Sequence, residues 1–331
     1  MKLIKYLSSC LTIILILFLI AGYFLIDHKL TPPPNYLQLS DDFDEIPITW
    51  WQDESSEMAA LLLPVRLRQT DKTFYMQFDL GSPSTIFYKR TLADLESHVP
   101  DLHFEIDSTN HLLNFSFDMG NINISATKFR IIEYGDSINW GDSTSLNIIG
   151  TIGSDLLEKK LTLLDFINDT CYFGNTLSDT GINEGLSDFS FKYRWVFLPA
   201  EINGKKRKLW YDSGTSGFEL ITSESIWKKM AKSGATPVIH DANSWGNTLK
   251  THTIEVDEII RFGTTNVKLK SATYVEGHTF LQEIIGRTTG MGGMIGNKIF
   301  MDKQVLIDCK NRKFGIFNHD ISRVGKGESH P

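Results

Sequence analysis

The sequence predicts an all-β protein built from two similar lobes with few short helices. From about Ile48 onward, short alternating apolar runs are separated by turn residues, which is typical of strands joined by tight turns. Helical periodicity is rare over the same range. The order of motifs in the first half of the chain recurs in the second half, which indicates an internal duplication.

Length and composition fit this prediction. The chain has 331 residues, of which 41% are hydrophobic and 22% are charged, so it is long enough to form two lobes with apolar cores. The formal net charge is -7 and the lysines and arginines are scattered. Because binding to phosphates requires a basic surface, we expect no nucleic-acid partner.

Residues 1–26 are predicted to form a single-pass signal-anchor. Lys2 and Lys5 precede an uncharged run, residues 6–26, that is long enough to cross a hydrocarbon core of about 30 Å. A cleaved signal peptide is the alternative, but its apolar region usually spans about 7 to 15 residues, and the cleavage signal near Ala21 is weak. The lysines are expected to hold the N-terminus in the cytoplasm. The rest of the chain would then be periplasmic, extracellular or lumenal.

The repeat divides the remaining chain. Its expected parts are a juxtamembrane stalk, an N-terminal lobe, a linker, a C-terminal lobe and a polar tail, which cover residues 27–57, 58–176, 177–190, 191–320 and 321–331. The stalk contains three consecutive prolines and is expected to be extended. The best helix candidates are residues 89–97 and 223–233, and Ser223 is a good N-cap for the second of them.

Two short motifs occupy corresponding places in the lobes. Asp79-Leu80-Gly81-Ser82 and Asp212-Ser213-Gly214-Thr215 each follow an apolar run, so each is expected to be a strand that ends on an aspartate in a tight turn. Asp and Gly are common in turns for backbone reasons alone. Two such turns at equivalent positions of a duplication indicate one shared site.

Further segments repeat around these motifs. Residues 62–67 recur as 197–202, and residues 150–157 match 293–300. Asp165 and Asp308 follow the second pair of segments at the same spacing. A glycosidase would need a pair of carboxylates, but these two lack the Gly-hydroxyl turn, and we expect them at strand ends.

With these motifs the chain resembles the two-lobed pepsin-like aspartic peptidases, and more loosely the retropepsins, over about residues 58–318. The resemblance includes the apolar-apolar-Gly elements that end at Gly153 and Gly296. It implies a pepsin-like fold, endopeptidase activity with Asp79 and Asp212 as the catalytic pair, a peptide or protein substrate in the cleft between the lobes, and a monomer.

Catalysis in that family requires two carboxyl groups held close together. Two carboxyl groups about 3 Å apart cannot both ionise and therefore share one proton, as in aspartic proteases. One group then acts as general base on a water while the other donates to the scissile carbonyl. No metal ion or other cofactor is expected. Gly81 and Gly214 would let the two backbones approach each other. Ser82 and Thr215 are expected to hydrogen-bond the carboxylates and lower their pKa, which predicts a mildly acidic optimum.

Leu80 departs from the pattern. The resemblance implies a hydroxyl at this position that ties the two aspartate loops together, and only Ser213 supplies it here. Loss of one such buried hydrogen bond costs on the order of 1 kcal/mol, which predicts a looser pair. A catalytically inactive pepsin-fold protein that binds a peptide or an envelope component is therefore the alternative function.

The flap is the second departure. The family covers its substrate with a first-lobe hairpin that bears a tyrosine, and no tyrosine lies between Tyr88 and Tyr134. Trp245, in a comparable turn of the second lobe, is either a covering aromatic or a buried or partner-facing one. The expected tip of the first-lobe flap consists of Asp107, Ser108, Thr109, Asn110 and His111.

Three cysteines are too few for a disulfide framework. Cys10 belongs to the expected anchor. Cys171 and Cys309 fall near the ends of the two lobes, where they either pair or both stay reduced.

Overall fold

A computed structural model describes residues 22, 24, 27–40, 44–54, 56–175, 184–277 and 291–318. The chain divides into two compact units, Met1–Pro34 and Asn35–Pro331. In the first unit residues 27–30 are helical, and the Thr31 hydroxyl donates to the main-chain oxygen of Asp27. No helix within the described ranges is long and apolar enough to span a membrane. The expected anchor lies almost entirely outside those ranges.

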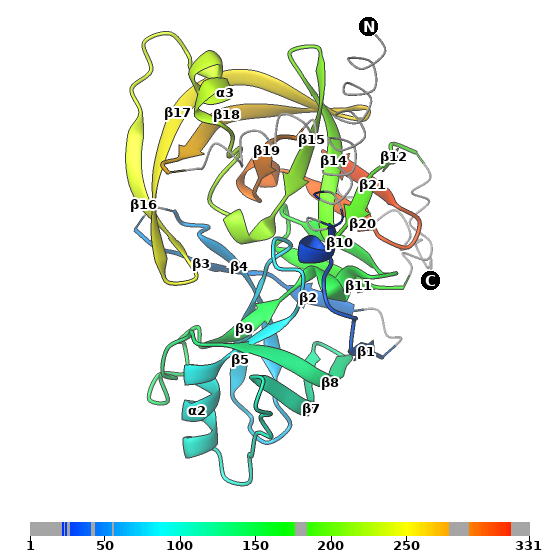
Figure 1. The fold of residues 1–331 in the computed structure, drawn as a ribbon, viewed down its shortest axis with the longest axis vertical. Helices are drawn as coiled ribbons and strands as arrows, with labels where there is room; N and C mark the ends of the chain where they lie inside the picture. Colours follow the sequence, from blue (N-terminus) through cyan, green and yellow to red (C-terminus); the bar gives the residue numbers. More distant parts are fainter. Residues whose placement is uncertain are drawn as a thin grey trace, which may run out of the picture. The chain divides into compact units, whose positions relative to one another are not determined.

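The second unit is mostly β-structure, and its first half forms an eight-stranded sheet (Figure 1). The strand order is β1-β8-β6-β9-β5-β4-β3, and β7 pairs with β4 and β8. The strands are β1 (Leu37–Leu39), β3 (Thr49–Trp51), β4 (Ala60–Arg66), β5 (Thr73–Phe78), β6 (Ile86–Tyr88), β7 (His111–Met119), β8 (Ile122–Ile132) and β9 (Ile148–Ile152).

The second half forms a seven-stranded sheet with the order β16-β17-β14-β15-β19, to which β13 and β18 add through β14 and β17. Its strands are β13 (Ser190–Lys192), β14 (Trp195–Ile202), β15 (Lys205–Tyr211), β16 (Val238–Ser244), β17 (Asn247–Phe262), β18 (Thr265–Val275) and β19 (Met291–Ile295).

A six-stranded sheet joins the two halves, with the order β12-β21-β20-β10-β11-β2. At its centre β10 from the first half pairs antiparallel with β20 from the second. Asp165 and Asp308 are the last residues of these two strands, as expected. The strands are β2 (Asp44–Pro47), β10 (Leu161–Asp165), β11 (Thr170–Gly174), β12 (Ser187–Asp188), β20 (Gln304–Asp308) and β21 (Lys313–Phe317).

The duplication is visible in how each aspartate strand is held. β5 runs parallel to β9, and β15 runs parallel to β19. At the end of each pair the aspartate N–H donates to the strand behind it, Asp79 to Ile152 at 3.0 Å and Asp212 to Ile295 at 2.9 Å. Short 3-10 turns, Ser154–Leu157 and Lys298–Phe300, then follow β9 and β19. The prediction of an all-β chain with two similar halves is confirmed.

Two helices lie where the sequence predicts them, α2 (Lys89–His98) and α3 (Glu224–Met230). The Ser223 hydroxyl caps α3 by accepting the N–H of Ile226. α3 is shorter than expected because Ala231 leaves the helical conformation and forms a β-bridge with Val256.

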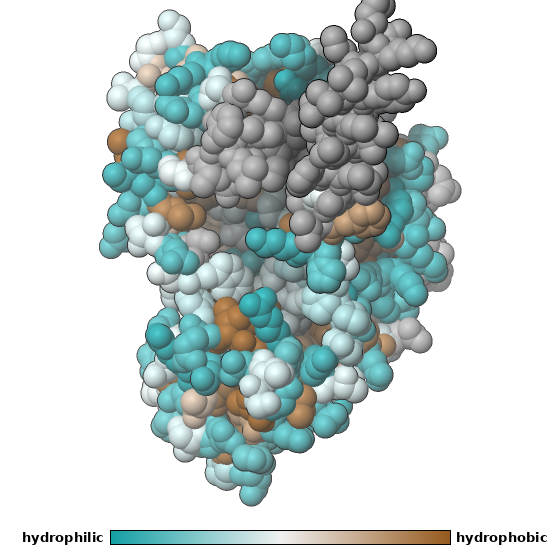
Figure 2. Space-filling view, viewed as in Figure 1, coloured by the Kyte–Doolittle hydropathy of each residue, from teal (hydrophilic) through white to brown (hydrophobic). Residues whose placement is uncertain are grey.

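Apolar side chains fill the interior of the sheets. The largest fully buried ones include Phe74, Phe78, Phe87, Tyr211 and Phe300. Figure 2 shows that hydrophilic side chains cover most of the described part of the visible face, with hydrophobic ones in scattered groups. Cys171 and Cys309 are both buried free thiols, so the reduced alternative applies.

Candidate active site

Each aspartate is positioned by its own turn. One carboxylate oxygen of Asp79, Oδ1, accepts the N–H groups of Gly81 at 2.8 Å and Ser82 at 3.1 Å. Oδ1 of Asp212 accepts the N–H of Gly214 at 2.9 Å. Each β-strand ends directly before its aspartate. The carboxyl group therefore accepts main-chain N–H groups from the turn that follows, and the residue two positions after each aspartate is a glycine.

The two carboxyl groups meet. Asp79 and Asp212, hereafter the dyad, hydrogen-bond to each other, and the two residues are only 7% and 8% exposed. A Cβ atom on Gly81 would lie 2.5 Å from the Asp212 carboxylate oxygens, and one on Gly214 would lie 2.4 Å from Oδ1 of Asp79. The glycines are therefore needed because each loop lies directly against the carboxyl group of the other.

Burial governs the titration of the dyad. It raises the pKa of Asp79 above its ordinary value, although the hydrogen bond from Asp212 and the turn N–H groups oppose the shift. Burial and then the neighbouring Asp79 charge raise the pKa of Asp212 well above its ordinary value. The pair thus keeps a proton at a pH at which an exposed carboxyl group has lost it.

The hydroxyls beside the dyad have other partners than expected. Oγ of Ser82 donates to the main-chain oxygen of Ser84 at 2.8 Å, and Oγ1 of Thr215 donates to the main-chain oxygen of Asp212 at 2.9 Å. The expectation that these hydroxyls bind the carboxylates and lower their pKa is wrong, because both close their turns through the main chain. Ser82 still reaches the Asp79 carboxylate, but through its main-chain N–H and not through its hydroxyl.

Ser213 ties the two aspartate loops together. Its Oγ accepts the N–H of Leu80 at 3.0 Å and donates to the main-chain oxygen of Phe78 at 2.7 Å. Leu80 itself is fully buried in the apolar core and supplies no return bond from its side chain. The side-chain bond from the second loop to the first is therefore present, and the corresponding bond from the first loop to the second is missing.

A polar residue supports each loop from behind, and neither one was predicted from the sequence. Asn297 donates to Oγ of Ser216 at 2.7 Å and accepts the Tyr211 hydroxyl at 2.7 Å. In the first lobe Ser154 donates to the main-chain oxygen of Ser82 through both its N–H and its hydroxyl. The sequence feature that could have identified them is a small polar residue directly after Gly153 and after Gly296.

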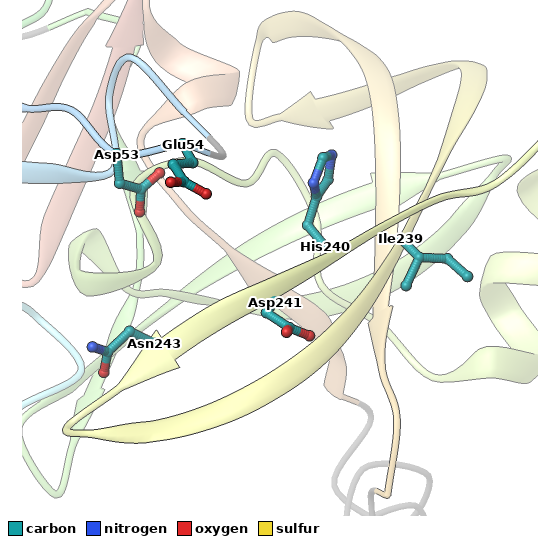
Figure 3. A pocket seen from close by; sticks show the side chains of 6 residues that line it. All are labelled: Asp53, Glu54, Ile239, His240, Asp241 and Asn243. Carbon is teal, nitrogen blue, oxygen red and sulfur yellow. The ribbon is translucent and has the colours of Figure 1, made fainter.

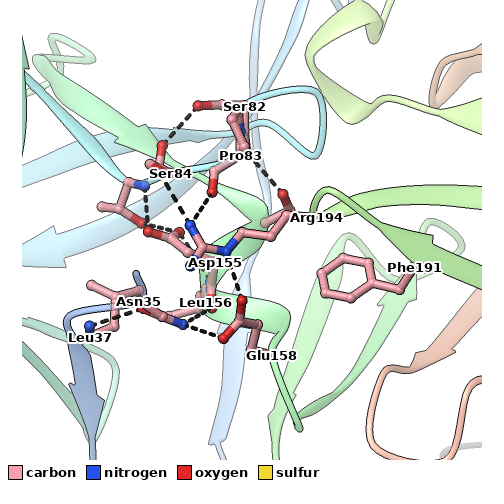
Figure 4. Close-up of polar contacts among 12 residues, drawn as sticks. Asn35, Leu37, Ser82, Pro83, Ser84, Asp155, Leu156, Glu158, Phe191 and Arg194 are labelled. Carbon is pink, nitrogen blue, oxygen red and sulfur yellow. Dashed lines mark hydrogen bonds and ion pairs between the residues drawn. The ribbon is translucent and has the colours of Figure 1, made fainter. Parts of the chain in front are cut away.

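Arg194 connects the start of the second lobe to the first aspartate loop (Figure 4). It is 5% exposed and donates to the main-chain oxygen of Pro83 at 3.0 Å and to Glu158 at 2.7 Å. Its charge also faces Asp155, whose carboxylate accepts the N–H and hydroxyl of Thr85. Burial raises the pKa of Asp155 to about 6 against these bonds and the Arg194 charge. These contacts were not predicted from the sequence.

The expected first-lobe flap is a short hairpin. A single β-bridge joins Ile106 to Leu112, and the Asp107 carboxylate closes the turn by accepting N–H groups from Thr109 and His111. The turn also contacts β8, where Ile131 donates to Asn110. A covering role for residues 107–111 remains a prediction.

The second-lobe hairpin β16–β17 is longer and carries Trp245 at its tip. Trp245 and Gly246 have positive φ angles of 52° and 83°, which form its tight turn. The Trp245 ring lies edge-on to Tyr88 and Tyr134 of the first lobe, with centroids 6.1 and 5.9 Å away. These two tyrosines also pack edge-on against each other. The sequence did not indicate that they meet the tryptophan.

A cavity of about 540 Å³ lies beside β16 (Figure 3). It has the size of a typical small-ligand or side-chain pocket. Three carboxylates give it a negative lining. The segment that follows Asp53 and Glu54 packs against the second aspartate loop, since a Cβ on Gly217 would lie 3.0 Å from Ser56. The lining residues are Asp53, Glu54, Ile239, His240, Asp241 and Asn243.

Aromatic side chains lie along the strand that leads to Asp212. Trp210 precedes Asp212 by two positions on an extended strand, so both project from the same face of the sheet. The Trp195 ring packs against Trp210 at a tilt of 37°, with ring centroids 4.8 Å apart. The indole nitrogen of each is buried without a hydrogen-bond partner in the described structure. This aromatic surface was not predicted.

Comparison with solved structures defines the class of fold. The aspartic proteinase from Irpex lacteus superposes with a TM-score of 0.52 at 9% sequence identity, covering 87% of this chain and 100% of that one. Conglutin gamma, a basic 7S globulin from lupine seeds, gives a TM-score of 0.49 at 9% identity, covering 87% and 97%. No family model and no curated protein matches the chain. The chain has the two-lobed pepsin-like fold, and at this identity the likeness concerns the fold alone.

The raised pKa values predict how stability depends on pH. An unfolded carboxyl group titrates near its ordinary value, so the folded dyad binds more protons than the unfolded chain above that pH. Stability contributed by the dyad is therefore complete below the unfolded pKa and is lost as pH rises through the folded values.

Asp212→Asn replaces a carboxyl group whose raised pKa costs folding free energy at neutral pH, where the same group in the unfolded chain is ionised. We expect it to raise the Tm at pH 7 by about 1–2 °C, the shift that roughly 1 kcal/mol produces in a chain of 331 residues, and to change it less at pH 4. Thermal unfolding of wild type and variant at both pH values measures this. An equal shift at both pH values would contradict the assignment of the raised pKa to the dyad.

Proposed function

We propose that the protein is an aspartic endopeptidase that hydrolyses peptide bonds with the Asp79/Asp212 dyad. The observation that carries this proposal is the hydrogen bond between two buried carboxyl groups presented by equivalent turns of a duplicated fold. Ser213 joins the two turns, and the glycines allow their approach. A pair that holds one proton has both a base and an acid within reach of one bound peptide.

The reaction follows from the shared proton. The ionised carboxylate takes a proton from a water as the water oxygen bonds to the scissile carbonyl carbon, while the protonated carboxyl group donates to the carbonyl oxygen. The resulting tetrahedral intermediate then collapses as the C–N bond breaks, the leaving nitrogen is protonated and the new carboxyl group forms. This scheme needs no metal ion and no nucleophilic side chain.

The test uses the full-length chain with an unfolded protein or a peptide library. We expect internal cleavage, detected by mass spectrometry as new peptide termini, and inhibition by a statine-containing peptide, whose hydroxyl mimics the tetrahedral intermediate. The rate should follow a bell-shaped pH profile, since both the doubly protonated and the fully ionised dyad are inactive. Activity that rises steadily above about pH 8 would rule out this mechanism.

Leu80 favours a second candidate, a pepsin-fold protein that binds a peptide or an envelope component without cleaving it. Without a hydroxyl at this position, the two aspartate loops share one side-chain tie instead of two. The same experiment separates the candidates, because this one predicts that the library peptides bind and remain intact.

The proposal extends to location and partners. The uncharged run at residues 6–26 supports a membrane anchor with the peptidase unit on the extracytoplasmic side. Peptide segments of secreted or membrane-bound proteins would then be the substrates, and a monomer would suffice because one chain supplies both aspartates.

A further inference from the structure

The hairpin β16–β17 has a strand edge that can pair with a further strand. Among the described strands β16 pairs only with β17, so its other edge offers main-chain N–H and C=O groups to a further strand. Side chains of β16, among them His240 and Asp241, line the 540 Å³ cavity together with Asp53 and Glu54 (Figure 3). An extended peptide is the partner that satisfies such an edge.

The tip of this hairpin is fastened to the first lobe. Trp245 packs on Tyr88 and Tyr134, and we call these three residues the aromatic latch. Asn243, two positions before Trp245, hydrogen-bonds the Tyr134 hydroxyl. A Cβ on Gly246 would lie 3.8 Å from the Tyr134 ring, so the main chain of the turn also rests on this tyrosine.

The latch lies beside the first aspartate. The Tyr88 hydroxyl is hydrogen-bonded to Oγ1 of Thr151 at 2.7 Å, and the next residue, Ile152, accepts the N–H of Asp79. Burial is the main cause that raises the pKa of Tyr88, and the Asp79 charge is a further one. A second-lobe element is therefore fixed next to the first-lobe half of the dyad.

The hairpin at residues 106–112 of the first lobe and the hairpin β16–β17 of the second lobe differ in length. The first-lobe hairpin is joined at Ile106 and Leu112 by one bridge before its turn at residues 107–111. β16 and β17 pair continuously from Val238 opposite Thr253 to Ser244 opposite Asn247. Only the second-lobe hairpin carries an aromatic ring at its tip that contacts the opposite lobe within the described structure.

We propose that β16–β17 is the lid of the active site, that an extended peptide pairs with the free edge of β16, and that the aromatic latch closes the lid over the bound peptide. Trp245 is then a positioning residue that acts through the hairpin. This inference rests on the proposed function and assigns the covering role to the second lobe instead of residues 107–111.

The latch is tested first without any substrate. Hydrogen exchange of the full-length chain is followed in β16–β17 for wild type, Trp245→Ala, Trp245→Phe and Ile259→Ala. Ile259 is 58% exposed, lies near the far end of β17 and serves as the matched control. We expect Trp245→Ala to accelerate exchange at the hairpin tip about 10-fold or more, Trp245→Phe to restore most of the protection, and Ile259→Ala to leave the tip unchanged.

The second arm adds a peptide that the wild type cleaves. We expect Trp245→Ala to raise KM about 10-fold with a smaller change in kcat, and Trp245→Phe to recover most of the loss. In the Asp212→Asn background, the same peptide should protect the β16 amides from exchange.

The outcomes separate the lid from the proposed function. Unchanged exchange at the tip of Trp245→Ala overturns the latch whether or not peptides are cleaved. An unchanged KM in Trp245→Ala, or a bound peptide that leaves the β16 amides unprotected, overturns the lid even if the latch exists. If the wild type cleaves no peptide but the library peptides bind and protect β16, the lid stands and the peptidase proposal fails. If no peptide binds at all, both fail.

Discussion

Asp79→Asn and Asp212→Asn are each expected to lower kcat/KM for peptide hydrolysis about 10³-fold or more. An amide cannot take a proton from the attacking water, nor can it donate one as a carboxylic acid does. Because the two carboxyl groups share one proton, removal of either one disables both the base and the acid. The double variant should therefore lose little more than each single variant.

The matched control is Asp308→Asn. Asp308 also lies at the end of a strand, β20, but its carboxylate accepts the N–H and side-chain amide of Asn311 and takes no part in the dyad. Rates are measured with one peptide at the optimal pH, and circular dichroism establishes that each variant is folded. Equal activity of wild type and both dyad variants would refute catalysis by Asp79 and Asp212.

Ser213→Ala is expected to lower the free energy of unfolding by about 2–4 kcal/mol. The substitution leaves two buried groups without their partner, the N–H of Leu80 and the main-chain oxygen of Phe78. Since Leu80 supplies no side-chain tie in return, the loops would also hold the dyad less firmly, and we expect kcat to fall about 10-fold or more.

Denaturant unfolding measures the first effect and steady-state kinetics the second. Ser97→Ala is the control, because Ser97 is exposed on α2 and its hydroxyl bonds the helix main chain. Ser213→Thr retains the hydroxyl and tests whether its loss is the cause. A Ser213→Ala variant as stable and active as wild type would mean that the loops are joined by other contacts.

The parts of the fold that depend on local sequence could be predicted. Alternating apolar residues identify a strand with one buried face, and an aspartate followed by a glycine identifies the turn at its end. The two segments at 150–157 and 293–300 repeat these local signals, so the duplication could be recognised in the amino-acid sequence alone. The position of α3 also followed from its Ser223 cap and apolar spacing.

Side-chain contacts that depend on the exact turn geometry or on distant segments were not predictable in the same way. Hydroxyls next to an aspartate have several main-chain acceptors within reach, and the exact turn decides that Ser82 bonds Ser84 and Thr215 bonds the Asp212 main chain. Arg194 lies in a mostly aromatic stretch two positions after Lys192, and its role depends on where Pro83 and Glu158 lie in the folded chain.

The amino-acid sequence alone determined that residues 79–82 and 212–215 form turns at the ends of strands. Strand alternation and turn preferences depend only on residues that are close together in the sequence. Tertiary structure alone decided that burial raises the pKa of both carboxyl groups, that Ser213 reaches across to Leu80, and that Trp245 rests on Tyr88. These features depend on how the two halves pack, and a side chain carries no local signal of what it will meet more than a hundred residues away.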